Sequence, residues 1–201
     1  MKMSALDRIL ILLTGLLAAY QIVVGIDDLS TAPIIAYTIA FGVLLVALLL
    51  LIILGFDALE SPVVVVVSTA IPLSLSLGLV WEHLASLRTP YLLFTIFGFV
   101  AVIFTRSAPM QNRVPTIVIA IVHGIAGITI FLLPIVISLQ AQVRPAFSLV
   151  GIGGALIGLG GLLLSFLKAG RPILSKSTIL RVMPGLLLLM TVCFVAGFKY
   201  G

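Results

Sequence analysis

The fold is decided by an uninterrupted apolar stretch at Val114–Leu139, VPTIVIAIVHGIAGITIFLLPIVISL, which contains no Asp, Glu, Lys or Arg. A helix needs about 20 such residues to cross the roughly 30 Å hydrocarbon core of a bilayer. The chain as a whole has the same character, because 62% of its 201 residues are hydrophobic and only 8% are charged. A typical soluble domain has about 25% charged residues. The composition therefore predicts an integral membrane protein whose solvent is lipid.

Six further apolar stretches without Asp, Glu, Lys or Arg flank this one. They are Ile9–Gly25, Ile34–Phe56, Val63–Trp81, Tyr91–Thr105, Ala146–Leu167 and Val182–Phe198. The sequence predicts an all-α, polytopic transmembrane helical bundle of seven spans, in one integral membrane domain over residues 1–201 with no soluble domain. Tyr91–Thr105 is short and must recruit Thr89 and the aliphatic part of Arg106 to cross. If it fails, six spans remain and both termini lie on one side.

The charges at the ends of the spans predict the orientation. If the N-terminus is cytoplasmic, three of the eleven Lys and Arg residues lie outside, namely Arg88, Arg144 and Lys199. The other eight lie inside, as the positive-inside rule requires. These eight are Lys2, Arg8, Arg106, Arg113, Lys168, Arg171, Lys176 and Arg181. The net charge of +5 is thus explained by topology and does not call for a nucleic-acid partner.

Aromatic residues give an independent indication of the same orientation. Tyrosine and tryptophan favour the membrane interface, because their rings are apolar and their tips are polar. Those near the predicted outer ends are Tyr20, Tyr37, Trp81, Tyr91 and Tyr200. We therefore expect the N-terminus in the cytoplasm and the C-terminus outside. We expect the membrane to be a prokaryotic cytoplasmic (plasma) membrane.

His123 is the one histidine, acidic or basic side chain deep inside a predicted span. It lies nine residues beyond Val114, about 13 Å along the helix. A bilayer tolerates such a group only when something nearby satisfies it. Gly124 and Gly127 beside it would let another helix, or a flat cofactor, approach closely.

Two interpretations of His123 stay open. The first is a neutral imidazole bonded to a hydroxyl or carbonyl of a neighbouring helix. The candidate hydroxyls for this bond include Ser68, Thr69, Ser74 and Thr129. The second is contact with a haem, quinone, pigment or lipid. No cofactor is assigned by the sequence.

The only other histidine, His83, follows Trp81 and Glu82 at the outer end of the third span. Its predicted depth differs from that of His123 by more than about 10 Å, so the two cannot clamp one haem iron. We expect no metal site. The three residues are either a solvated helix end or an outer-face contact for a ligand or partner.

The sixth predicted span is rich in glycine, with two small-xxx-small pairs, Gly151 with Ala155 and Gly154 with Gly158. Residues 151, 154, 158 and 161 fall on one helical face, which would let backbones come close together. We interpret Gly151, Gly154, Ala155, Gly158 and Gly161 as a packing face against another helix of this chain or of a partner.

Several function classes are disfavoured by what the spans do not contain. No Asp or Glu lies within a span, as ion-coupled transporters usually require, and no lysine lies deep in the last span, as a retinal protein requires. HExxH and GxSxG are absent, and the single cysteine, Cys193, cannot form an internal disulfide. Two hypotheses remain. The chain is a non-enzymatic structural or accessory subunit among other integral membrane subunits, or a small binder or carrier of a hydrophobic ligand at His123.

Overall fold

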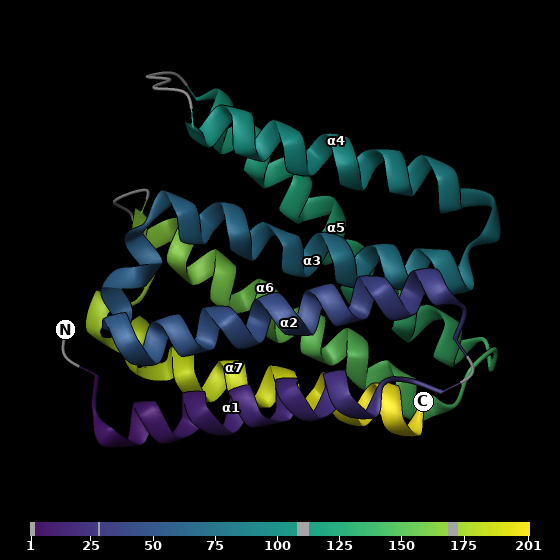
Figure 1. Cartoon of the computed structure of the whole chain (residues 1–201), viewed down its shortest axis with the longest axis horizontal. Coiled ribbons are helices and arrows are strands. Elements are labelled where there is room, and N and C mark those ends of the chain that lie inside the picture. The colour runs from purple at the N-terminus through teal and green to yellow at the C-terminus, as the bar shows by residue number, and fades with distance from the viewer. Residues whose placement is uncertain (1–2, 28, 108–112, 169–172) are drawn as a thin grey trace.

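The computed structural model describes residues 3–27, 29–107, 113–168 and 173–201. Its long helices are α1 (Ala5–Val24), α2 (Thr31–Leu54), α3 (Pro62–His83), α4 (Arg88–Ser107), α5 (Val114–Leu139), α6 (Ser148–Lys168) and α7 (Lys176–Tyr200). The 3-10 turns η1 (Gly55–Glu60), η2 (Ala85–Leu87) and η3 (Pro145–Phe147) precede α3, α4 and α6. Within the described residues the protein is an all-helical bundle of roughly parallel and antiparallel rods, as predicted (Figure 1).

The helix boundaries are set by capping residues as much as by hydropathy. The weakest predicted span, Tyr91–Thr105, is a 20-residue helix that begins at Arg88 and ends at Ser107. Helix α7 begins at Lys176, well before the predicted Val182, because the Ser175 hydroxyl accepts a hydrogen bond from the Thr178 amide at 3.1 Å. An apolar count misses such polar first turns, which are helical although they lack the apolar side chains of a span.

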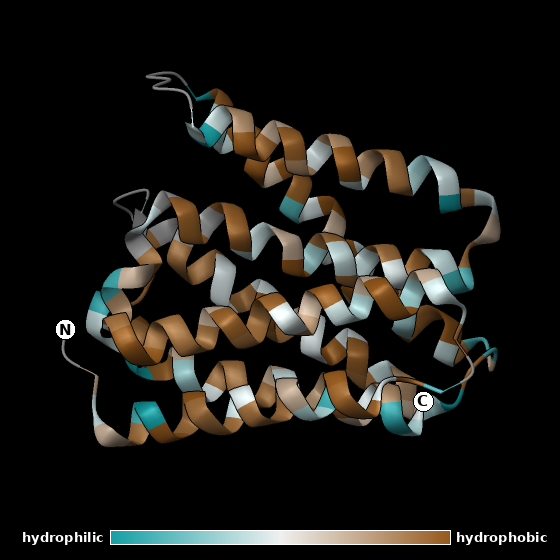
Figure 2. Cartoon of the chain, viewed as in Figure 1, coloured by the Kyte–Doolittle hydropathy of each residue, from teal (hydrophilic) through white to brown (hydrophobic). Residues whose placement is uncertain are grey.

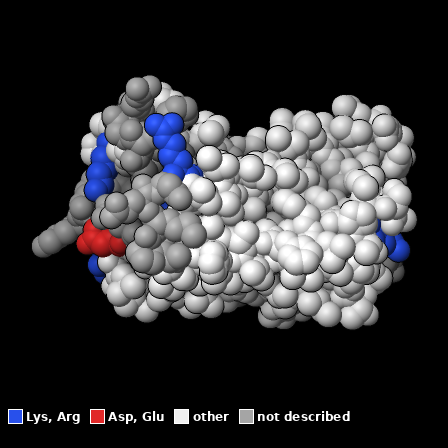
Figure 3. All heavy atoms as spheres, turned by 90° about the horizontal axis from the view of Figure 1, so that it is seen from above, with Lys and Arg blue, Asp and Glu red and all other residues white. Residues whose placement is uncertain are grey.

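The helices are apolar along their length and polar at their ends (Figure 2). Among the described residues, six helical segments are long and apolar enough to cross a membrane, and the 22-residue α3 runs beside them. On the face shown in Figure 3, Lys, Arg, Asp and Glu lie only toward the two ends, with an uncharged belt between them. This is the charge distribution of an integral membrane protein that contacts the lipid bilayer.

The two termini lie at opposite ends of the bundle (Figure 1). We call them the N end, where α1 begins, and the C end, where α7 finishes. Helices α1, α3, α5 and α7 run from the N end to the C end, and α2, α4 and α6 run back.

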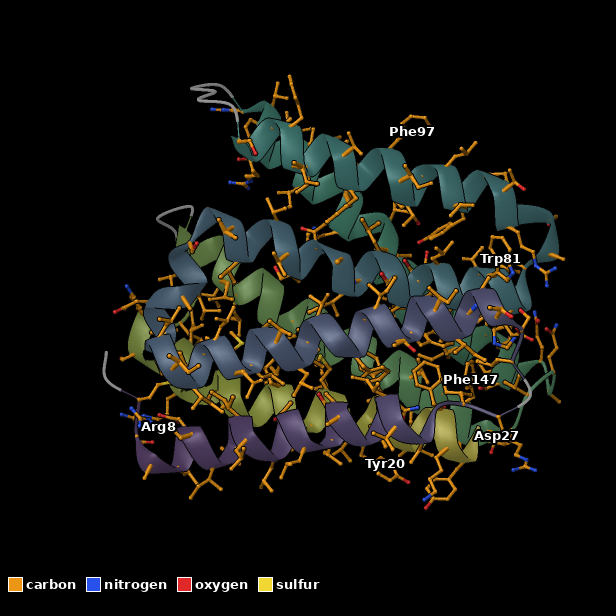
Figure 4. The ribbon with its side chains drawn as sticks, viewed as in Figure 1. Arg8, Tyr20, Asp27, Trp81, Phe97 and Phe147 are labelled. Carbon is orange, nitrogen blue, oxygen red and sulfur yellow. The ribbon has the colours of Figure 1, made fainter. Side chains whose placement is uncertain are left out.

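Six helices close into a ring, and the seventh lies outside it. Each of α1, α2, α3, α5, α6 and α7 packs against the next, and α7 returns to α1. Among the described residues, α4 packs against the long helices α3 and α5 and is set apart from the others (Figure 1). Its Phe97 side chain is 66% exposed and points away from the bundle (Figure 4), as expected of a residue that faces lipid.

A cluster of aromatic side chains fills the interior of the ring of six helices near the C end. Phe198 of α7 lies 4.7 Å from Tyr37 and 6.2 Å from Phe41, both on α2, measured between ring centroids. Phe147 of η3 lies 6.0 Å from Phe198. Gly78 of α3 makes room for this cluster, because a Cβ there would lie 2.5 Å from the Tyr37 ring. Large interlocking rings therefore hold the C end of the bundle together.

Candidate functional site

The hydrogen-bond partner of His123 lies on its own helix. Its Nδ1 lies 3.1 Å from the carbonyl oxygen of Ile119, one turn earlier on α5. Of the two interpretations left open by the sequence, the bond to a neighbouring helix is not the bond seen for Nδ1, which has a carbonyl of α5 itself as its partner, and the contact with a ligand stays a prediction. A carbonyl oxygen can only accept, so Nδ1 carries the proton and donates it. In the neutral ring the other nitrogen, Nε2, then has a lone pair and can accept a hydrogen bond.

The two glycines beside His123 have no neighbouring helix against them. A Cβ built at Gly124 or Gly127 meets no heavy atom within 4 Å outside its own helix backbone. Gly124 is exposed and Gly127 is half-buried. The close approach that these residues permit is therefore not used by any helix of the chain within the described residues.

The glycines of α6 that lie nearer the C end pack tightly against α5. A Cβ at Gly151 would lie 2.5 Å from the carbonyl oxygen of Phe131, and a Cβ at Gly154 would lie 2.8 Å from the Ile130 side chain. These two positions tolerate no side chain unless a backbone moves. This part of the predicted packing face brings α5 and α6 together.

The same face of α6 is open nearer the N end. Gly158 lies seven residues after Gly151, two turns along one face, yet a Cβ there meets nothing within 4 Å. Ala155, Gly158 and Gly161 are all exposed. Helices α5 and α6 therefore diverge toward the N end.

The open glycines of the two helices lie at matching depths. From the contact between Ile130 and Gly154, Gly127 lies about 4.5 Å and Gly158 about 6 Å toward the N end. Gly124 lies about 9 Å from that contact in the same direction. We call Gly124, Gly127, Ala155 and Gly158 the open glycine surface. His123 lies at the edge of this surface, one helical turn nearer the N end than Gly127.

The other side of α6 has no such opening. A Cβ at Gly153 would lie 2.7 Å from the Phe194 ring, and one at Gly160 would lie 3.1 Å from Leu186, both on α7. Within the described residues the α7 side is thus covered in both halves of α6, and the open side is the one that faces α5. Sequence alone could not separate these glycines, because the difference arises from the divergence of α5.

Trp81, Glu82 and His83 are the last three residues of α3 and lie at the C end of the bundle, where Figure 4 labels Trp81. The Arg88 Nε donates to the Trp81 carbonyl at 2.6 Å, and the Arg88 guanidinium lies 5.9 Å from the Trp81 ring centroid. The His83 ring packs edge-on against Phe147 at 5.2 Å. These contacts tie α3 to its neighbours, and an outer-face contact for a partner stays a prediction.

The described residues contain no group of three or more His, Cys, Asp or Glu side chains placed to hold a metal ion. The structure also forms a polar contact that we did not predict, between Tyr20 of α1 and Lys199 of α7, 179 positions apart. Both residues were predicted at the outer ends of their spans. Their pairing required knowing that the first and last helices are neighbours.

Comparisons of the chain with protein-family models, with curated proteins and with solved structures find no match.

Proposed function

We propose that this protein is a structural or accessory subunit of a larger integral membrane complex. Its open glycine surface would bind a transmembrane helix of a different subunit. The observation that carries the proposal is the set of three glycines on α5 and α6, Gly124, Gly127 and Gly158, against which no helix packs within the described residues.

Helix association in lipid depends on close packing, because lipid tails are as apolar as the side chains. A surface without side chains lets a partner backbone approach, and the gain is dispersion contact over a long stretch. Within this chain, glycine already allows close helix packing at Gly151 and Gly154, where α6 lies in contact with α5. A partner helix would continue this packing toward the N end.

His123 would give such a contact its specificity. His123 lies at the edge of this surface on α5, so a partner residue that donates a hydrogen bond to Nε2 of the neutral ring would be selected over an apolar one. Interhelical hydrogen bonds of this kind are worth about 0.6 kcal/mol on average in membranes. That is too little to drive association and enough to favour one register.

The test is to purify the protein from its native membrane in a mild detergent and to measure the size and composition of the particle. We expect a particle that contains a second membrane protein. Gly158→Leu, which fills the open surface, should release that protein while the melting temperature of the bundle stays unchanged.

Gly42→Leu is the matched control. A Cβ at Gly42 also meets nothing within 4 Å, but it lies on α2, which packs between α1 and α3. This variant should keep the partner. A wild-type particle that holds only this chain, whether as one copy or several, would contradict the proposal.

We propose a second candidate function on a specific observation at His123. The Nδ1–H bond to a backbone carbonyl is the arrangement that orients many metal-ligating histidines, with Nε2 toward the metal. A hydrophobic ligand such as a haem, quinone, pigment or lipid could occupy the open glycine surface. An absorption spectrum and a quinone and lipid extraction of the purified protein, with His123→Ala beside it, separate this function from the first. A ligand lost only in the variant, with the fold intact, favours the carrier.

For the orientation we propose that the N end faces the cytoplasm of a prokaryotic plasma membrane. The support is the eight-to-three division of the eleven Lys and Arg residues along the chain. Labelling of single cysteines in a Cys193→Ser background, one at Arg8 and one at Arg144, with an impermeant thiol reagent would test it. Only the Arg144 position should react in intact cells.

A further inference from the structure

The first and last helices meet at the C end through a lysine held between two tyrosines. The Lys199 Nζ donates a hydrogen bond to the Tyr20 hydroxyl at 3.2 Å. It also lies 5.7 Å from the centroid of the Tyr20 ring and 5.6 Å from that of Tyr200. No carboxylate is paired with Lys199 in the part of the chain that the structure describes. The ammonium therefore keeps hydrogen-bond donors, and an uncompensated charge, for another group.

These residues border an open hollow of about 270 Å³ between α1 and α7. The hollow has a polar rim of Tyr20, Lys199 and Tyr200 and an apolar floor. The floor is lined by Leu17, Val192, Val195 and Ala196. Because α1 runs toward the C end and Leu17 precedes Tyr20 by three residues, the floor extends from the rim toward the middle of the membrane.

The two parts of the hollow match the two parts of a phospholipid. A cation and phenol groups at the end of a transmembrane helix lie at the level of the headgroups. The Tyr20 hydroxyl accepts from Lys199, so its own proton is free to donate to a further oxygen. We propose that this hollow is a binding site for an anionic phospholipid. Its phosphate is held by Lys199 and Tyr20, and its acyl chain lies along Leu17, Val192, Val195 and Ala196.

A lysine in the last turn of a helix has a simpler use, which is to offset the negative end of the helix dipole. That use predicts an effect of Lys199 substitutions on stability alone. Lipid binding predicts a loss of bound lipid whether or not stability changes. The site lies on α1 and α7 at the C end, whereas the open glycine surface lies near the middle of α5 and α6, so its test is independent of the proposed function.

The experiment is native mass spectrometry of the purified protein in detergent with equal amounts of phosphatidylglycerol and phosphatidylcholine of identical acyl chains. We expect preferential retention of one phosphatidylglycerol. Lys199→Gln should weaken that retention about tenfold, as expected when one hydrogen bond to a charged group is lost. Lys199→Arg should keep it, and Tyr20→Phe should weaken it less than Lys199→Gln because the ring remains.

Arg144→Gln is the matched control, because Arg144 is an exposed cation at the same end of the bundle. It should leave lipid retention unchanged. Equal retention of the two lipids, or unchanged retention in Lys199→Gln, would overturn the proposal. Displacement of the lipid by millimolar inorganic phosphate would assign the site to a free anion and would also overturn it.

Discussion

The C-end and N-end halves of the bundle are built from similar sequences but are packed differently. Near the C end, the glycines of α6 lie against backbone and side chains of α5, and an aromatic cluster fills the ring. Near the N end, α5 and α6 diverge, and their glycines have open space beside them. The same small-xxx-small pattern thus serves internal packing in one half and leaves a bare surface in the other.

Both halves of the bundle contain buried core residues, such as Phe198 near the C end and Ile11 near the N end, so the difference is confined to the surface between α5 and α6. Residues that interlock within the chain should be costly to change. Residues on the open glycine surface should be cheap to change in the isolated protein and costly only where a partner is present.

Phe198→Ala should have the largest effect, lowering the free energy of unfolding by about 2–3 kcal/mol. Phe198 is 8% exposed and contacts Tyr37, Phe41 and Phe147. This loss is at or below the lower end of the range measured for buried Phe→Ala substitutions in soluble proteins. The smaller loss is expected because the bundle is surrounded by lipid, so burial of the ring gains less than burial from water. Denaturation in mixed micelles, followed by circular dichroism, gives the measurement.

The control for this variant is Phe104→Ala, in the half of α4 near the N end. Phe104 is 65% exposed and faces lipid, so its removal should change the free energy of unfolding by less than about 0.5 kcal/mol. Equal effects of the two substitutions would mean that the aromatic cluster does not hold the C end together.

Gly151→Ala should have the next largest effect, a loss of about 1–3 kcal/mol, because its Cβ would meet the Phe131 carbonyl oxygen and force the backbones apart. Gly158→Ala, on the same face two turns away, should be neutral or stabilising by up to about 1 kcal/mol, since alanine is the better helix former. The same micelle denaturation measures both variants. A loss at Gly158 as large as that at Gly151 would show that α5 and α6 do not diverge.

His123→Ala should have the smallest effect on the isolated protein, below about 1 kcal/mol, because the bond lost is an intrahelical one to Ile119. Thermal melting in detergent measures it. A much larger loss would mean that His123 supports the fold, and the open surface would then lose its proposed source of specificity.

Much of the fold could be predicted from the sequence, because lipid imposes simple requirements on length and charge. All seven predicted spans are helices, including Tyr91–Thr105, and the turn positions follow from the charged residues between them. The starts of α4 and α7 could not be predicted from hydropathy, since Arg88 and Lys176 are helical but polar. Capping by Ser175 was the available signal for α7.

The candidate site was predictable only in part. His123 and the glycines of α6 are conspicuous in the sequence, but their neighbours depend on the angle between α5 and α6. That angle is set by contacts such as Gly151 with Phe131, which no single-sequence pattern specifies. The Lys199–Tyr20 pair depends likewise on the ring closing between α1 and α7.

Site-specific photocross-linking in the native membrane tests the central claim most directly. A photoreactive residue at Gly124 or Gly158 should give a covalent product with one other membrane protein. The same residue at Phe97, which faces lipid on α4, should give lipid adducts only. Lipid adducts alone at all three positions, or the same protein product at Phe97, would contradict the claim that the open glycine surface binds a partner helix.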